Sequence, residues 1–135
     1  ENLAALMLGR PPESCGMLGH CGPQLVVEAD GSLYPCDFYA LDEWRLGNIK
    51  DDSFEQIDQK REELGFISRS RTLPKECRIC PYLALCRNGC CRLCSMEKQE
   101  DGTYIRGKNY YCGAYREFFA YALPRLEELV RLWGK

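Results

Sequence analysis

The sequence predicts a small α+β domain, and three observations support this prediction. Asp30-Gly31 separates two short apolar runs, which is a strong local signal for a β-hairpin. The last stretch of the chain repeats its apolar residues at the 3.6-residue period of an α-helix. Four of the ten cysteines fall within 77–90, and the packing of a hydrophobic core does not require cysteines in such a cluster. We therefore expect a hairpin, short helices, cysteine-bearing loops and one long C-terminal helix.

The first residues predict the end of a helix. Leu3, Leu6 and Met7 lie at helical spacing, and the pattern stops at Gly-Arg-Pro-Pro in 9–12. A face this short needs an apolar partner elsewhere, which suits the tail of an upstream domain. We accordingly divide the chain into an upstream tail (1–12), a cysteine-rich domain (13–120) and a C-terminal helix (121–135).

Cys15 and Cys21 come next, in a segment rich in glycine and proline. Glycines beside cysteines suit a loop whose backbone approaches another group closely. The hairpin follows, with predicted strands at 25–28 and 32–36. Pro35 indicates that the second strand is an edge strand or ends there. The hairpin would return the cysteine at its end, Cys36, toward the two before it.

The middle of the chain predicts one helix between irregular segments. Residues 37–49 show no regular period. Asp52 and Glu55 resemble a capping box, which would begin a short helix that ends near Gly65. We expect 66–76 to be a basic loop.

The second half predicts short helical turns in the cysteine block and one long helix at the end. The polar stretch 97–108 contains a turn signal, Asp101-Gly102. The last helix is predicted over about 114–133, with its apolar stripe, Trp133 included, in the core. Pro124 is expected to kink or restart it.

Composition and charge limit the function classes. A net charge of −2 gives no reason to expect a nucleic-acid or membrane partner. The first residues lack the basic segment and the long apolar run of an export signal. Abundant cysteine without such a signal predicts a reducing, cytoplasmic compartment, where thiols remain free to bind metal.

The cysteine block has the spacing Cys77-x2-Cys80-x5-Cys86-x3-Cys90. Two cysteines separated by two residues can direct both sulfurs at one metal centre. Disulfides do not require this spacing, and the predicted compartment disfavours them. Structural zinc uses sites of four cysteines, and so do iron–sulfur clusters. The spacing by itself leaves zinc and iron–sulfur clusters equally open.

The choice between zinc and iron–sulfur clusters is narrowed by the cysteine spacing over the whole chain, which resembles that of a known family. The pattern is Cys15-x5-Cys21-x14-Cys36-x40-Cys77-x2-Cys80-x5-Cys86-x3-Cys90-x21-Cys112. It resembles the C-terminal SPASM domain of radical S-adenosylmethionine enzymes, above all the anaerobic sulfatase-maturating enzymes. Two short segments also resemble the sequences of that family: Ala-Asp-Gly-Ser-Leu-Tyr-Pro-Cys-Asp (29–37) and Cys-Arg-Asn-Gly-Cys (86–90). The resemblance covers about 13–120.

The resemblance implies two auxiliary [4Fe-4S] clusters with all eight of these cysteines as ligands. The first cluster would be held by Cys15, Cys21, Cys36 and Cys90. The second would be held by Cys77, Cys80, Cys86 and Cys112. The assignment of Cys90 to the first cluster rests on the resemblance alone. Full thiolate ligation leaves no iron open to substrate, which favours electron transfer.

The resemblance also implies a reaction and a catalytic residue. The enzymes of this family oxidise a cysteine or serine of a sulfatase to formylglycine. A radical removes a Cβ hydrogen, an aspartate takes the side-chain proton, and an auxiliary cluster accepts the surplus electron. Asp37 matches that aspartate, because it directly follows Cys36. Without the resemblance, Asp37 would be interpreted as a carboxylate that caps a turn.

The chain contains no C-x3-C-x2-C motif for the radical-generating cluster. We therefore expect S-adenosylmethionine and a third [4Fe-4S] cluster in an upstream barrel, and an inactive fragment without it. Expected partners are that barrel, a sulfatase or other peptide, and an electron donor such as a flavodoxin or ferredoxin. Two alternatives remain: the same module from another peptide-modifying radical enzyme, or a non-catalytic zinc-binding interaction domain.

Three further side chains could mimic ligands. Cys91 and Cys94 repeat the two-residue spacing, but the eight cysteines already complete the pattern. We interpret both as spare, packed thiols. His20 is the only histidine, and we expect it to be a hydrogen-bond partner rather than a ligand.

Overall fold

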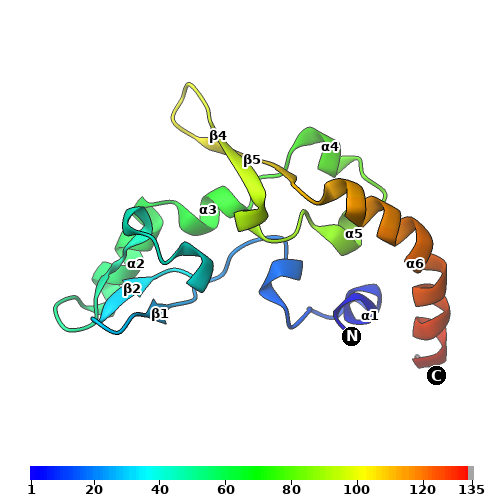
Figure 1. The fold of residues 1–135 in the computed structure, drawn as a ribbon, viewed down its shortest axis with the longest axis horizontal. Helices are drawn as coiled ribbons and strands as arrows, with labels where there is room; N and C mark the ends of the chain where they lie inside the picture. The colour runs from blue at the N-terminus through cyan, green and yellow to red at the C-terminus, as the bar shows by residue number, and fades with distance from the viewer. Residues whose placement is uncertain (134–135) are drawn as a thin grey trace.

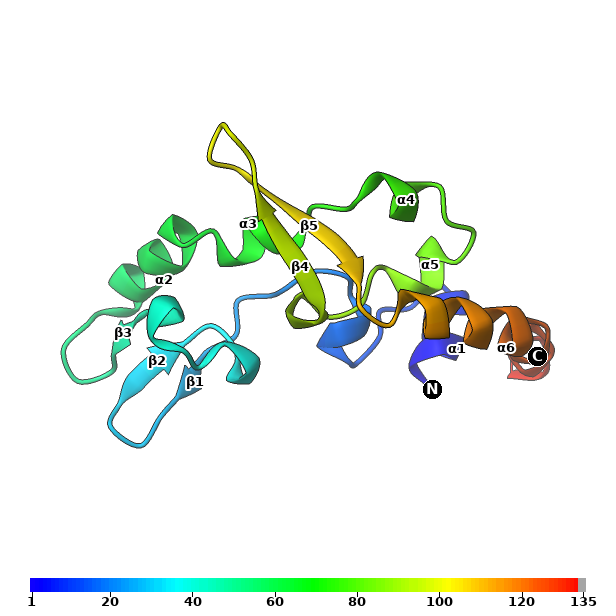
Figure 2. The same cartoon turned by 45° about the horizontal axis from the view of Figure 1, so that its top comes forward.

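Helices and small antiparallel sheets alternate along the chain in the computed structural model, which describes residues 1–133. The α+β class is confirmed. The helices are α1 (Asn2–Met7), α2 (Phe54–Glu63), α3 (Phe66–Ser70), α4 (Lys75–Arg78), α5 (Leu83–Cys86) and α6 (Cys112–Trp133). The strands are β1 (Val26–Val27), β2 (Ser32–Tyr34), β3 (Gly47–Asn48), β4 (Cys94–Lys98) and β5 (Tyr104–Asn109). The molecule is elongated: β1–β3 and α2 lie at one end, and α1 and α6 lie at the other (Figures 1 and 2).

The predicted hairpin is confirmed as β1 and β2. Val26 pairs with Tyr34 and Val27 with Leu33. Asp30 stabilises the turn, because its carboxylate accepts hydrogen bonds from the Ser32 backbone N–H (2.9 Å) and hydroxyl (2.8 Å). A third strand, β3, pairs with the other side of β2, so β2 is central rather than an edge. It ends one residue before Pro35, as expected of a residue that cannot donate to the sheet.

Helix α2 begins one residue later than the predicted capping box. The box is formed by Ser53 and Gln56: the Ser53 hydroxyl accepts from the Gln56 N–H (3.3 Å), and Gln56 Oε1 accepts from the Ser53 N–H (2.7 Å). Asp52 instead accepts from the Asn48 N–H (2.7 Å), which ties the helix start to β3. The predicted end near Gly65 is confirmed, since Gly65 adopts a left-handed φ of 66°.

Two segments that the sequence pattern left irregular are regular. Residues 66–70 form α3 rather than a loop, because Phe66 is buried against the rings of Tyr39 (5.1 Å) and Trp44 (5.6 Å). The polar stretch after Cys94 forms the β4–β5 hairpin, which projects from the middle of the molecule (Figure 2). Many of its side chains are exposed, so its sequence lacks the apolar alternation of a half-buried strand.

Helix α6 is continuous through Pro124 and changes direction along its length (Figure 1). Of the two predicted outcomes, a kink or a restart, the structure therefore shows a bend within one continuous helix. The predicted core position of its apolar stripe is wrong within 112–133, because Phe119 alone is buried and Trp133 is 62% exposed. Its partner here is the short helix α1, which is too small to cover the stripe. Residues 134–135 of the predicted helix lie outside the described residues.

The apolar core is small and lies at one end. It consists of Leu33, Leu46 and Ile57, with Leu64 packed against them, between the first sheet and α2. Within residues 1–133, no helix is both long and apolar enough to cross a membrane.

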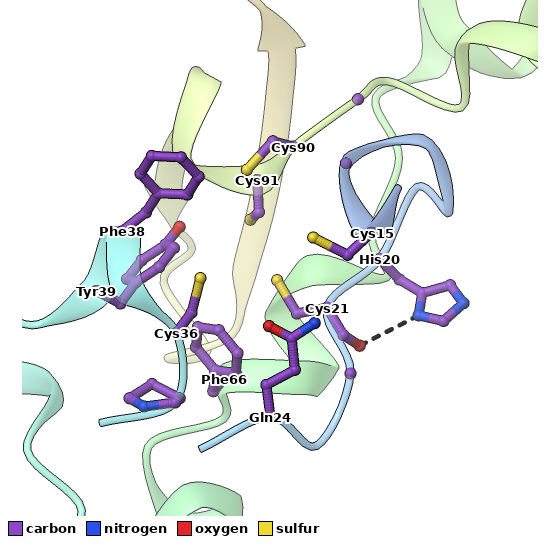
Figure 3. A pocket seen from close by; sticks show the side chains of 14 residues that line it. Cys15, His20, Cys21, Gln24, Cys36, Phe38, Tyr39, Phe66, Cys90 and Cys91 are labelled. Carbon is purple, nitrogen blue, oxygen red and sulfur yellow. Dashed lines mark hydrogen bonds between the residues drawn. The ribbon is translucent and has the colours of Figure 1, made fainter. Parts of the chain in front are cut away.

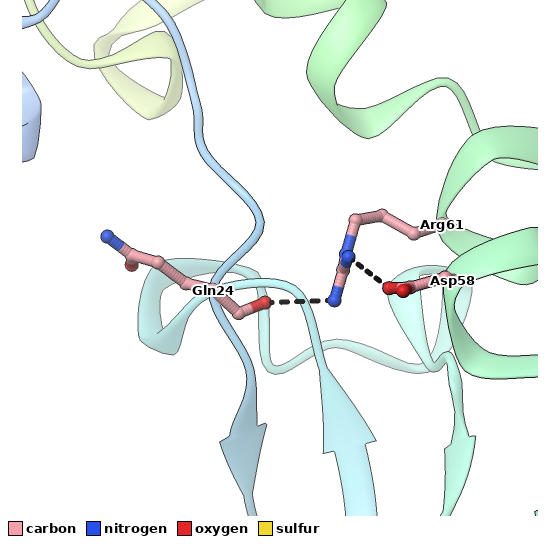
Figure 4. A network of polar contacts seen from close by, with 3 residues as sticks. All are labelled: Gln24, Asp58 and Arg61. Carbon is pink, nitrogen blue, oxygen red and sulfur yellow. Dashed lines mark hydrogen bonds and ion pairs between the residues drawn. The ribbon is translucent and has the colours of Figure 1, made fainter. Parts of the chain in front are cut away.

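A buried arginine attaches the segment after Cys21 to this end. Arg61 of α2 is 6% exposed, pairs with Asp58, and donates to the Gln24 carbonyl at 3.3 Å (Figure 4). The anchor holds the chain that leads from the cysteine loop into β1 against α2.

Candidate metal centres

Four of the predicted ligands surround one cavity between the two ends of the molecule. Cys15, Cys21, Cys36 and Cys90 all line it, and their sulfurs point into a common space (Figure 3). The first two lie on the loop before β1, the third directly follows the end of β2, and the fourth precedes a short 3-10 turn. The structure therefore brings together the first set that the family resemblance implies.

The loop that carries Cys15 and Cys21 is held by close backbone contacts. Gly19 has a φ of 82°, and a Cβ there would lie 2.6 Å from the Cβ of Arg87. Only glycine allows the loop to approach the segment between Cys86 and Cys90 this closely. The Cys21 N–H donates to the hydroxyl of Ser70 at 2.9 Å, which fixes the loop against α3.

The other four predicted ligands surround a second cavity. Cys77, Cys80, Cys86 and Cys112 line it, together with Tyr82 and Phe119. They belong to α4, to the turn after it, to the end of α5 and to the start of α6. Tyr82 and Phe119 stack with their rings 5.6 Å apart and close one wall.

A left-handed loop directs Cys86 and Cys90 to different cavities. Arg87, Asn88 and Gly89 have φ values of 48°, 66° and 64°. Such a run reverses the chain within three residues, and it is rare for residues other than glycine.

Asn88 holds this loop in place. Its side chain is buried, donates to the Gly107 carbonyl (2.9 Å) and accepts from the Asn109 N–H (2.9 Å). The left-handed loop is thereby tied to β5, which offsets part of the cost of its backbone conformation.

The donor sets fit cationic iron centres. Burial raises the pKa of the thiols of Cys77 and Cys86, and burial with a hydrogen bond to Asp37 raises that of Cys36 to about 11. A metal that binds these thiols would displace their protons into solvent. Within the described residues, no three His, Cys, Asp or Glu side chains lie close enough together to hold a single metal ion. Each set of thiols instead surrounds a space, as the ligands of a four-iron cubane do.

Cys91 is buried, as a packed thiol would be, and it also lies at the first site. It lines the first cavity with the four predicted ligands. The nearby Cys91 thiol raises the pKa of Cys21, and Cys21 in turn lowers the pKa of Cys91. Its position directly after Cys90 is the sequence signal that could have indicated this. Cys94 is buried, as predicted, and accepts a hydrogen bond from Arg106 Nε at 3.3 Å.

Asp37 and His20 lie beside the first cavity. Asp37 is exposed, and its Oδ1 accepts a hydrogen bond from the Cys36 thiol at 3.1 Å. His20 Nδ1 lies 3.1 Å from the Cys21 carbonyl oxygen, and its ring points away from the sulfurs (Figure 3). The predicted hydrogen-bonding role of His20 is observed.

A family model described as an iron–sulfur cluster-binding domain, SPASM, matches residues 20–81. The chain belongs to the SPASM family. The match includes Cys21 and Cys36 of the first site and Cys77 and Cys80 of the second. Two curated relatives agree with it over nearly the whole chain.

The cysteine-type anaerobic sulfatase-maturating enzyme of Clostridium perfringens is 46% identical over 92% of this SPASM chain. The serine-type enzyme of Bacteroides thetaiotaomicron is 30% identical over 94% of it. The chain spans 32% and 30% of the lengths of these two enzymes, about a third.

The solved structure of native anSMEcpe with bound AdoMet matches 96% of this SPASM chain, at 44% identity and a TM-score of 0.82. The chain covers 35% of that protein. The same protein with AdoMet and the Cp18Cys peptide matches with a TM-score of 0.81.

Proposed function

We propose that this SPASM domain is the electron-accepting, substrate-facing module of an anaerobic sulfatase-maturating radical S-adenosylmethionine enzyme. The observation that carries the proposal is the presence of two separate cavities, each lined by four of the eight cysteines. Cys15, Cys21, Cys36 and Cys90 would hold one [4Fe-4S] cluster. Cys77, Cys80, Cys86 and Cys112 would hold the other.

When bound, the clusters supply a one-electron acceptor shielded from water. The chain's own residues would hold and orient them and manage one proton. Oxidation of the substrate's Cβ–H and S–H or O–H bonds removes one hydrogen atom, one proton and one electron. Asp37 is proposed to take the proton, since it lies exposed next to the first cavity and carries a carboxylate.

The rest of the reaction belongs to a part of the enzyme outside this chain. S-adenosylmethionine, the third cluster and the radical step are assigned to an upstream barrel, so the fragment alone would be inactive. A flavodoxin or ferredoxin would serve as the external electron donor. A chain with ten cysteines that must keep its thiols free is suited to the reducing cytoplasm.

The substrate side chain to test first is cysteine, because the higher identity is to a cysteine-type enzyme. The complete anaerobic enzyme would be incubated with S-adenosylmethionine and matched sulfatase peptides that carry either Cys or Ser. Mass spectrometry should detect formylglycine, and its formation should be lost in Cys80→Ala and Cys21→Ala variants.

Normal product formation by a variant that lacks either auxiliary cluster would contradict the proposal. Modification of an unrelated peptide, with neither sulfatase peptide altered, would assign the module to another peptide-modifying radical enzyme.

A further inference from the structure

Arg106 of β5 is a permanent positive charge with no exposure to solvent. In the part of the chain that the structure describes, the ion pairs are Lys60–Glu63 and Arg61–Asp58, so no carboxylate neutralises Arg106. An unpaired buried charge is costly, and it persists only where something else compensates it.

Hydrogen bonds account for every donor of the side chain. Nη1 donates to the carbonyls of Gly19 (2.7 Å) and Ser70 (2.8 Å), and Nη2 donates to those of Asn88 (2.6 Å) and Gly89 (2.7 Å). Nε donates to the sulfur of Cys94 (3.3 Å). These carbonyl dipoles satisfy the guanidinium geometrically, but they leave its net charge of one in place.

Three of the four carbonyls that accept from Arg106 belong to the loops that carry the ligands of both cavities, and the fourth, that of Ser70, lies at the end of α3. Gly19 lies two residues before Cys21, on the loop of the first cavity. Asn88 and Gly89 lie between Cys86 of the second cavity and Cys90 of the first. The guanidinium is therefore located at the junction of the two proposed cluster sites.

We propose that Arg106 is the shared buried counter-charge of the two clusters and raises the reduction potential of both. The inference rests on the proposed function, since it requires the clusters. A [4Fe-4S] cluster with four thiolates carries net negative charge, and one-electron reduction adds another. A fixed cation in a low-dielectric surround stabilises the reduced form more than the oxidised form.

This role differs from that of a structural clamp. A clamp would affect whether the clusters are bound, but it would leave the potentials of bound clusters unchanged. A counter-charge acts on the potentials themselves, and a conservative substitution that keeps the charge should preserve them. Arg106 is a positioning residue in both cases, because it contacts the loops rather than the substrate.

The first test is a redox titration of the complete anaerobic enzyme, monitored by electron paramagnetic resonance. Arg106→Gln should make reduction of both clusters at least tenfold less favourable, a downward shift of about 59 mV for a one-electron couple. Arg106→Lys should stay near the wild-type potentials. Arg92→Gln is the matched control: Arg92 is exposed and follows Cys91 in sequence, so solvent should screen its charge.

A second pair of variants neutralises the charge and leaves the guanidinium in place, in case Arg106→Gln does not fold. Cys94→Asp puts a carboxylate beside Nε, and Cys94→Asn has the same shape without the charge. The Asp variant should show the lowered potentials and the Asn variant should not. Failure of the Asp variant alone to load clusters would count against the proposal, because an effect on binding rather than on potentials is what a clamp predicts.

The proposal would be overturned by equal potentials in Cys94→Asp and Cys94→Asn, or by wild-type potentials in a cluster-loaded Arg106→Gln enzyme. Either result would show that Arg106 is only a structural clamp. Iron and sulfide analysis of the wild-type enzyme separates this failure from that of the proposed function. A wild-type enzyme with no sulfide beyond that of the radical cluster would reject the two auxiliary clusters themselves.

Discussion

At the scale of single residues, sequence neighbours of the ligands have different surroundings. Asp37 directly follows Cys36 and remains exposed, whereas Cys91 directly follows Cys90 and is buried in the first cavity. The exposure of the Asp37 carboxylate is what the proposed proton transfer to it requires. Cys91 is buried and lines the same cavity as Cys21. The two residues therefore call for different tests.

Asp37→Asn in the complete enzyme should uncouple the reaction. The amide keeps the size of the side chain but cannot accept the substrate proton, and loss of a general base costs about 10²–10⁴ in rate. Iron content and cleavage of S-adenosylmethionine should persist while formylglycine formation falls, as followed by chromatography of both products. Asp42→Asn, at another exposed acidic residue that begins a 3-10 turn, is the control. Normal product formation by Asp37→Asn would show that Asp37 only stabilises a turn. Loss of iron would show that it supports the ligand Cys36.

The double variant Cys91→Ala/Cys94→Ala should keep the full iron content, because neither thiol belongs to the proposed ligand sets. Cys80→Ala or Cys112→Ala should instead lose one cluster, and Cys21→Ala or Cys90→Ala should lose the other. Each loss corresponds to about four irons per chain by colorimetric assay. Since Cys91 lines the first cavity together with Cys21, a Cys21→Ala enzyme that retains all its iron would identify Cys91 as a ligand.

At the scale of elements, the loop from Cys86 to Cys90 controls the geometry of both sites. It needs three left-handed residues in succession and the buried Asn88 that ties it to β5. Few sequences tolerate this backbone, which explains physically why the loop has the sequence Arg-Asn-Gly. Asn and Gly are the residues that adopt left-handed conformations most readily.

Gly89→Ala should impair the loading of both sites. The residue has a φ of 64°, and a Cβ would lie 2.8 Å from Nδ2 of the buried Asn109, so the loop or β5 must move. We expect less iron from both clusters and a lower melting temperature for the complete enzyme.

Gly102→Ala is the matched control for that substitution. Gly102 also has a left-handed φ, 84°, but a Cβ there would meet nothing within 4 Å. The substitution should lower stability by the backbone strain of about 1–2 kcal/mol without loss of iron. Equal iron loss in both variants would show that backbone strain, rather than the Asn109 contact, controls the sites.

At the scale of the whole molecule, the apolar core is too small to explain the fold. Leu33, Leu46 and Ile57 form it at one end, while both cavities lie outside it. Helix α6 also exposes large apolar side chains, among them Tyr121, Leu132 and Trp133. Bound clusters and the upstream domain are therefore expected to supply much of the stability, as structural metals do in other small domains.

The complete enzyme should contain about eight irons and eight sulfides from this domain, beyond those of the radical cluster. Their anaerobic removal should lower the melting temperature, and exposure to oxygen should do the same as the clusters decay. Because ligand thiols must lose protons, iron loading should be favoured as pH rises toward the raised pKa of Cys36, about 11. Two zinc ions, with no sulfide beyond that of the radical cluster, would instead support the zinc-binding alternative.

Local sequence determined the parts of this protein whose signals lie within a few residues. The β1–β2 hairpin follows from Asp30-Gly31, and the end of α2 follows from Gly65. The grouping of Cys77, Cys80 and Cys86 follows from their spacing, because short loops keep the thiols within reach of one another. Each of these features depends on turn chemistry or helical period, which act over a few bonds.

The tertiary structure decided what depends on partners distant in sequence. Strand β3 exists because it pairs with β2, and α3 forms where Phe66 packs on Tyr39 and Trp44. The separation of Cys86 from Cys90 required the left-handed loop that β5 supports. The buried charge of Arg106 gave no sequence signal, because its acceptors are backbone carbonyls from four residues far along the chain. Backbone groups are the same at every residue, so only the folded chain shows where they meet.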